Sequence, residues 1–148
     1  MGQFQIVDVF KHYHELFNNE HYHDFLNKVI NDEAKLNFLC RESISLLHGK
    51  RYEIEDTGAL LYLQHALWGP KEPMTIRSVV IDEAQDFSLL QVLALRNILN
   101  TNLLTIMGDL SQGIHGYRGI NDWTELNSSV FDQSNAHYVT LENSYQPP

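Results

Sequence analysis

The chain has 148 residues, a formal net charge of −9 and a hydrophobic content of 43%. This length and composition suffice for one folded domain with its own core. No apolar run approaches the roughly 20 residues that a membrane helix needs, and no cationic leader precedes a small-residue cleavage site, so we expect neither a membrane span nor export. The single cysteine, Cys40, excludes an internal disulfide framework and indicates the reducing cytoplasm. Its apolar neighbours predict a buried structural thiol.

The first half of the chain has the apolar spacing of amphipathic helices. Apolar residues recur three and four positions apart, and Asn18-Asn19, His48-Gly49 and Gly69-Pro70 supply helix stop signals. The predicted helices are Asp8–Phe17, His21–Ile30, Asp32–Leu47 and Thr57–Trp68. The triplets His12-Tyr13-His14 and His21-Tyr22-His23 are poor chelators, because helix positions i and i+2 face apart. We therefore expect surface or half-buried histidines rather than a metal site.

The second half of the chain, after residues 70–74, alternates between strands and helices. The predicted strands are Ser78–Ile81, Leu103–Met107 and His137–Leu141. The predicted helices are Ser88–Asn100 and Asn121–Leu126. Strands that alternate with helices predict an α/β fold with a parallel sheet.

The first strand of this half ends in a cluster of carboxylates, since residues 79–86 read VVIDEAQD. The strand delivers Asp82 and Glu83 to the carboxyl edge of the sheet, where ligands bind in open α/β folds. One carboxylate at this edge can hold Mg²⁺, and its neighbour can orient or deprotonate a water that attacks a phosphate. The alternative is an acid-rich helix N-terminus, because acids stabilise the first turn of a helix.

The second strand ends in a similar way, since residues 103–109 read LLTIMGD. The loop after it, LSQGIHGYRGI, combines three glycines with Gln112, His115, Tyr117 and Arg118. Such a loop can bring an amide and a guanidinium close to a charged ligand. Its aromatic side chains can also stack on the bases of a single strand that crosses the sheet edge.

These segments resemble the UvrD/Rep-like superfamily 1 helicases. DEAQD, GDLSQGIHGYRGI and LENSY match the second, third and fourth motifs of that family in order. The text from Asp56 through IRSVVIDEAQDFS is most similar to the HelD branch, whose members are ATP-driven motors that release stalled bacterial RNA polymerase from nucleic acid. The resemblance covers Asp56 to Tyr145. It implies ATP and Mg²⁺ as cofactors, single-stranded DNA as a partner of the intact parent, and RNA polymerase as a further partner.

The resemblance also implies a role for each matching position. Asp82 would bind Mg²⁺, and Glu83 would be the catalytic base. Gln112 would sense the γ-phosphate and couple it to movement, while Asp109 would support the nucleotide site through hydrogen bonds. Gln85 and Asp86 would link this motif to its neighbours. The positions that contact single-stranded nucleic acid in relatives are His115, Tyr117 and Arg118. For each of these residues a capping, loop or packing role remains the alternative.

The implied fold is α/β, a partial RecA-like P-loop NTPase parallel sheet preceded by a helical segment. Residues 1–55 would be the tail of an inserted subdomain, and residues 56–148 a partial RecA-like ATPase domain that lacks the P-loop. A P-loop reads Gly-x-x-x-x-Gly-Lys-Ser/Thr, but Ile44 stands at the first glycine position before Gly49-Lys50, and Arg51 follows the pair. We expect the shortened sheet to expose an edge through which the chain self-associates.

The fourth motif departs from the family pattern. Relatives place an arginine that reaches the γ-phosphate directly after the tyrosine, whereas here Gln146 follows Tyr145. A glutamine cannot supply that charge. Together with the missing P-loop, this substitution predicts that the chain alone does not hydrolyse ATP.

Two functions therefore stay open from the sequence. One is a fragment of an ATP-dependent helicase or translocase, and the other is a non-catalytic, helicase-like protein-interaction module. Asp82, Glu83 and Gln112 favour the first for the parent protein, while the absent P-loop and Gln146 favour the second for this polypeptide. The net charge of −9 predicts weak nucleic-acid binding by the chain alone, because phosphate neutralisation dominates such affinity.

Overall fold

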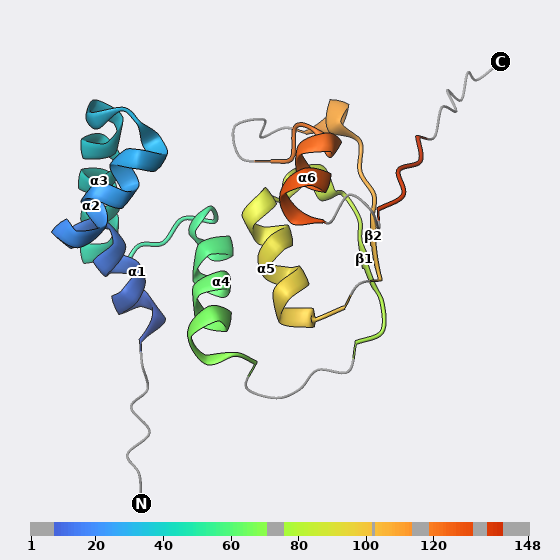
Figure 1. The fold of residues 1–148 in the computed structure, drawn as a ribbon, viewed down its shortest axis with the longest axis horizontal. Coiled ribbons are helices and arrows are strands. Elements are labelled where there is room, and N and C mark those ends of the chain that lie inside the picture. Colours follow the sequence, from blue (N-terminus) through green and yellow to red (C-terminus); the bar gives the residue numbers. More distant parts are fainter. Residues whose placement is uncertain (1–7, 71–75, 102, 114–118, 132–135, 141–148) are drawn as a thin grey trace, which may run out of the picture.

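The computed structural model describes residues 8–70, 76–101, 103–113, 119–131 and 136–140 (Figure 1). Its helices are α1 Val9–Asn18, α2 Glu20–Ile30, α3 Glu33–His48, α4 Asp56–Trp68, α5 Leu89–Leu99 and α6 Trp123–Val130. Its strands are β1 Val79–Ile81 and β2 Leu104–Ile106, and short 3₁₀ turns η1 Ala84–Asp86 and η2 Leu110–Gln112 follow them. All the predicted helices are confirmed; α6 begins later than expected and extends to Val130.

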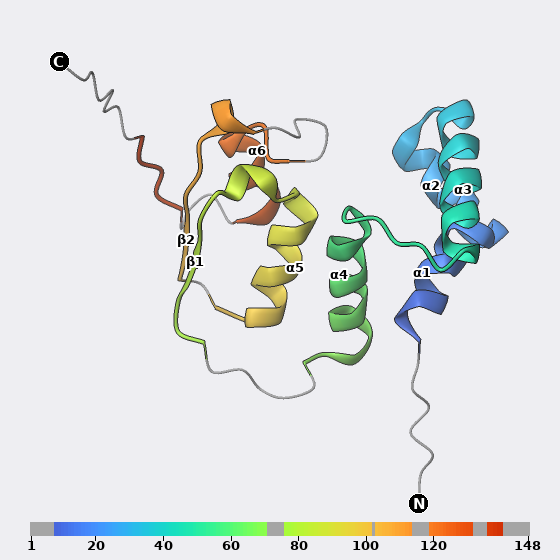
Figure 2. The ribbon, with the colours of Figure 1, turned by 180° about the vertical axis from the view of Figure 1, so that it is seen from behind.

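The two strands form a parallel pair in which Val79 faces Leu104 and Ile81 faces Ile106. One face of this pair packs against α5 and α6, which lie on the same side of the strands in Figures 1 and 2. The buried core on that face consists of Ile81, Ala84, Val92, Ile120, Leu126 and Val130. Successive side chains of a strand point to opposite faces of the sheet. Val80 therefore points away from this core and is 64% exposed.

The third predicted strand is wrong for the described residues 136–140, which form no strand. Tyr138 and Val139 are 68% and 77% exposed. Aromatic and β-branched residues favour a strand only where a neighbouring strand pairs with their backbone, and no described residue pairs with this segment. The described α/β fold is therefore mostly helical with a small parallel sheet.

Helix α4 packs closely on α5, and the two helices lie side by side in both views (Figures 1 and 2). Gly58 makes the approach possible, since a Cβ added there would lie 2.9 Å from the backbone nitrogen of Gln91. The Gln91 amide donates to Thr57 Oγ1 at 2.9 Å. Gln91 also forms a capping box with Ser88 at the start of α5. These contacts attach α4 to the half of the chain that carries the sheet.

Helices α1, α2 and α3 form a separate group on the other side of α4 (Figure 1). Leu36 and Leu47 are buried inside this group. Tyr13 of α1, also buried, reaches α4 and donates its hydroxyl proton to Asp56 Oδ1 at 2.7 Å. The second carboxylate oxygen of Asp56 accepts from the Glu53 backbone N–H at 2.8 Å. Burial and this bond to Asp56 raise the pKa of Tyr13 above its usual value.

We expect the variant Tyr13→Phe to lower the free energy of unfolding by about 1–2 kcal/mol, because it leaves a partly buried carboxylate oxygen without its donor. Urea denaturation followed by far-UV circular dichroism measures the change. Tyr22→Phe is the matched control, since Tyr22 is 44% exposed and its hydroxyl has no hydrogen bond to the described residues. An equal effect of both variants would contradict a specific role for the Tyr13–Asp56 bond.

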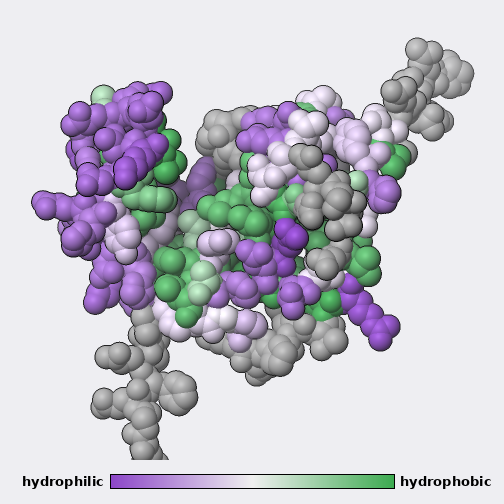
Figure 3. Space-filling view, in the orientation of Figure 1, coloured by the Kyte–Doolittle hydropathy of each residue, from purple (hydrophilic) through white to green (hydrophobic). Residues whose placement is uncertain are grey.

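The surface differs between the two halves of the molecule. On the face shown in Figure 3, hydrophilic side chains cover much of the α1–α3 group, and hydrophobic side chains gather over α4 and α5.

The expectation of a buried thiol was wrong, because Cys40 is only partly buried and its neighbours Phe38 and Leu39 are exposed. Helix α3 makes its main described contacts with α1 and α2, and exposed residues such as Phe38 show that much of its surface stays open. The partial burial of Cys40 still raises the pKa of its thiol.

Candidate functional site

The acidic motif lies directly after β1, in a turn with unusual backbone geometry. Asp82 and Glu83 are both exposed, and Glu83 adopts the left-handed conformation with φ 51° and ψ 41°. This conformation is uncommon for a residue other than glycine, and strained residues of this kind cluster at active sites and ligand clamps. The Glu83 backbone N–H donates to Asp82 Oδ1 at 2.9 Å, and the Glu83 carbonyl accepts from the Asp86 N–H at 3.1 Å. These bonds fix the turn that presents both carboxylates.

Gln85 joins this turn to the end of β2. Its side chain is almost fully buried, with 5% exposed. Its Nε2 donates to Glu83 Oε2 at 2.7 Å, and its Oε1 accepts from the Asp109 backbone N–H at 3.0 Å. The Ala84 N–H donates to the Met107 carbonyl at 2.9 Å beside them. The role expected for Gln85, a link between motifs, is confirmed, while Asp86 makes no side-chain hydrogen bond to the described residues.

Gly108 is the position that lets the two strand ends approach. A Cβ added to Gly108 would lie 2.4 Å from Gln85 Oε1 and 3.0 Å from the Ala84 backbone nitrogen. Real Cβ atoms do not come within 2.4 Å of an oxygen, so a larger residue at position 108 would force the Gln85 side chain to move. The glycine after β2 therefore preserves the observed position of Gln85.

Asp109 organises the turn η2 that follows β2. Its Oδ1 accepts from the Ser111 hydroxyl at 2.6 Å and from the Ser111 backbone N–H at 2.9 Å. Its Oδ2 accepts from Gln112 Nε2 at 2.8 Å. The bonds from the Ser111 hydroxyl, the Gln112 amide and the Ser111 N–H hold the pKa of Asp109 below its usual value. The Gln112 side chain is exposed and is held to the sheet edge through Asp109.

The lowered pKa of Asp109 predicts a pH-dependent contribution to stability. Because the folded-state value lies below the usual value of 3.8, the stabilisation is complete above that pH and is lost as pH falls through the folded value. We expect Asp109→Asn to unfold at lower urea than the parent at about pH 6, and the difference to shrink at about pH 2. Urea titrations across this range measure it. A constant difference at every pH would contradict the assignment to this carboxylate.

The structure thus brings Asp82, Glu83, Asp109 and Gln112 to one edge of the sheet, at the carboxyl ends of β1 and β2 (upper end of the strands in Figure 1). The residues predicted to contact nucleic acid, His115, Tyr117 and Arg118, lie outside the described residues. Tyr145 of the fourth motif and Gln146 after it also lie outside them.

The donor set at this edge fits Mg²⁺. Among the described residues no group of three or more His, Cys, Asp or Glu side chains is placed to enclose a metal. Magnesium is held in nucleotide sites by one or two carboxylates, with water and substrate phosphates as the remaining ligands. Asp82 is exposed, and only its Oδ1 accepts from the Glu83 N–H, so it is the carboxylate that would hold the ion.

Sequence reasoning missed the geometry of three features. Gly108 and the two-sided bonding of Gln85 were not expected, although a glycine directly after a strand is a signal for close backbone approach. The bond from Tyr13 to Asp56 joins residues from separate helices. No local pattern predicts it.

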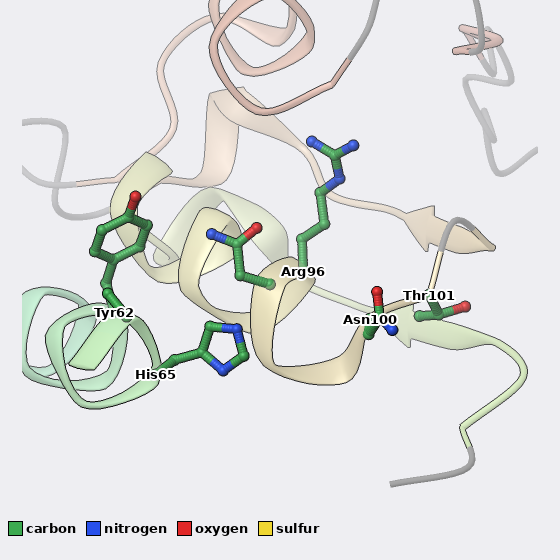
Figure 4. A pocket seen from close by; sticks show the side chains of 7 residues that line it. Tyr62, His65, Arg96, Asn100 and Thr101 are labelled. Carbon is green, nitrogen blue, oxygen red and sulfur yellow. The ribbon is translucent and has the colours of Figure 1, made fainter. Parts of the chain in front are cut away.

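A polar cavity of about 460 Å³ lies elsewhere, between α4 and α5 (Figure 4). Its lining residues are Tyr62, His65, Ala66, Arg96, Asn97, Asn100 and Thr101. Thr101 donates its hydroxyl proton to the Arg77 carbonyl at 2.9 Å, just before β1 begins. The cavity is thus at the amino ends of the strands, opposite the carboxylates, and ligands of α/β sheets bind at the carboxyl ends.

Comparison with known proteins identifies the family. The family model described as "UvrD/REP helicase N-terminal domain" matches residues 3–127, which include the turn after β1 and the loop after β2. The chain belongs to the UvrD/REP helicase N-terminal domain family. Searches of curated proteins and of solved structures gave no match.

Family membership makes this chain part of a UvrD-like superfamily 1 helicase domain. Such helicases generally use ATP and Mg²⁺ and bind DNA. Every helix in the described part of the chain is too short or too polar to span a membrane.

Proposed function

We propose that this chain forms the catalytic edge of a RecA-like ATPase domain in a superfamily 1 helicase. The observation that carries the proposal is the joining of the β1 and β2 ends by Gln85, which gathers two pairs of family motif residues at one sheet edge. Asp82 would hold Mg²⁺, and Glu83 would accept the proton of the attacking water. The nucleotide supplies the phosphoryl group, and a P-loop would come from a longer polypeptide.

Gln112 is proposed to sense the γ-phosphate by donating a hydrogen bond to it. Its exposed amide donates to Asp109 Oδ2, a contact that an incoming phosphate oxygen can replace at low cost. Such an exchange would release Asp109 from one of its donors. The loop after β2 would then change conformation with the state of the nucleotide.

The nucleic-acid and partner assignments are further parts of the proposal. His115, Tyr117 and Arg118 follow η2 in sequence, and two rings with a guanidinium suit stacking on single-stranded DNA. The excess of acidic residues indicates that most phosphate contacts come from domains of the parent other than this one. We propose a HelD-like parent that acts on RNA polymerase complexes, because the text from Asp56 to Ser88 is most similar to that branch.

The proposed division places residues 1–55 in an inserted subdomain and residues 56–148 in the ATPase domain. The packing of α4 on α5 supports a boundary at the start of α4. Contacts between the two parts include the Tyr13–Asp56 hydrogen bond.

A non-catalytic interaction module is the second candidate. It is favoured by the lack of a P-loop sequence in the 148 residues and by Gln146 at the arginine position. In that case Asp82 and Glu83 would only stabilise the turn after β1, without a role in catalysis.

Calorimetric titration of ATP in the presence and absence of Mg²⁺ tests the two candidates. We expect no binding to this chain alone, and Mg²⁺-dependent binding to a longer polypeptide that also contains a P-loop. Asp82→Asn in the longer polypeptide should remove the Mg²⁺ dependence. Absence of ATP binding in the longer polypeptide would reject the ATPase and leave the interaction module.

A further inference from the structure

Gln85 uses both ends of one buried carboxamide to join groups that are distant in the sequence. The Nε2 end donates to the Glu83 carboxylate at 2.7 Å, and the Oε1 end accepts from the Asp109 N–H at 3.0 Å. We infer that Gln85 is a positioning residue that couples the conformation of the turn η2 to the orientation of the Glu83 carboxylate. This inference rests on the proposed function, in which Glu83 is the base and Gln112 contacts the γ-phosphate.

The carboxamide has one workable orientation. A flipped amide would place N–H groups against the Asp109 N–H and an oxygen against the Glu83 carboxylate, so both contacts would become repulsive. The side chain is 5% exposed, and water therefore cannot replace a lost partner at low cost. The Gly108 backbone leaves no free space beside Oε1, where a Cβ would lie only 2.4 Å away.

Coupling follows from the series of contacts through Asp109. The backbone N–H of Asp109 holds Gln85, while its carboxylate accepts from Ser111 and Gln112. A displacement of η2 moves the Asp109 N–H, and Gln85 must follow it or lose a buried hydrogen bond. The Glu83 carboxylate, held by the other end of the amide, then changes its orientation.

Hydrogen exchange of the Asp109 amide in the ¹⁵N-labelled chain tests the coupling without any nucleotide. Gln85→Met should accelerate this exchange about 3- to 10-fold, as expected for the loss of one hydrogen bond. Glu83→Met should also change the exchange at Asp109, although Glu83 does not contact it. The decisive result is that Glu83→Met has no further effect in the Gln85→Met background. Independent, additive effects of the two variants would overturn the inference.

One further variant separates coupling from general destabilisation. Gln91→Met removes the same carboxamide from a residue that bonds Ser88 and Thr57, so it should lower stability without affecting Asp109. A change at Asp109 in Gln91→Met as large as that in Gln85→Met would overturn the inference.

In the full-length helicase, Gln85→Met should lower kcat for ATP hydrolysis about 10- to 100-fold with the KM for ATP unchanged, because it misplaces the base without altering binding. Gln91→Met should leave kcat unchanged. An unchanged kcat in Gln85→Met would overturn the positioning role. A wild-type protein without ATPase activity would overturn the proposed function, while the exchange experiment still decides whether Gln85 couples the strand ends.

Discussion

Replacing Glu83, the proposed catalytic base, with glutamine in a longer polypeptide that also contains a P-loop is expected to lower kcat for ATP hydrolysis by about 100- to 10,000-fold, the usual contribution of a general base. A glutamine side chain keeps the size of glutamate and can still accept from Gln85 Nε2, as the carboxylate does at 2.7 Å. It cannot accept a proton from water. Binding of ATP should therefore remain, and a steady-state ATPase assay combined with calorimetry separates the two quantities.

Asp86→Asn is the matched control for this prediction. Asp86 belongs to the same acidic motif and is exposed, but its carboxylate makes no hydrogen bond to the described residues. The control should keep kcat within a few-fold of the wild-type value. An equal loss in both variants would show that the general negative charge of the turn, rather than proton transfer at Glu83, supports the reaction.

Replacing Gly108 with alanine is expected to lower the free energy of unfolding by about 2–3 kcal/mol, which is the upper part of the range for overpacking a filled site. The new Cβ would lie 2.4 Å from Gln85 Oε1, 3.0 Å from the Ala84 nitrogen and 3.2 Å from the Gln85 nitrogen. The Gln85 side chain can move, but then it loses its bonds to Glu83 and Asp109. The two backbone nitrogens can move only if β1 and β2 separate. Urea denaturation of the chain measures the loss.

Gly113→Ala provides the comparison, because Gly113 lies in the same loop and has φ −61°. A Cβ at that position would come no closer than 3.4 Å to its neighbours, an ordinary contact. We expect this variant to change stability by less than about 0.5 kcal/mol. If the two alanine variants were equally stable, the strand ends would not be in the close contact described.

The sequence alone predicted the helices, both strands at the candidate site and the family. These features depend on local information: apolar spacing in α1 to α5, stop signals such as Gly69-Pro70, and contiguous motifs such as DEAQD. A helix satisfies its own backbone hydrogen bonds, so its position along the chain can be predicted without knowledge of its neighbours.

Only the tertiary structure decided which groups meet. Residues 136–140 have the composition of a strand but form none in the described residues, because a strand requires the backbone of a neighbour. The bonds of Gln85 to Glu83 and Asp109, and the bond of Tyr13 to Asp56, join positions that local sequence patterns do not relate. The sequence alone determined which chemical groups this protein carries at its strand ends. The parallel pairing of β1 with β2 decided that they lie together, since their distance depends on contacts between segments that are far apart in the chain.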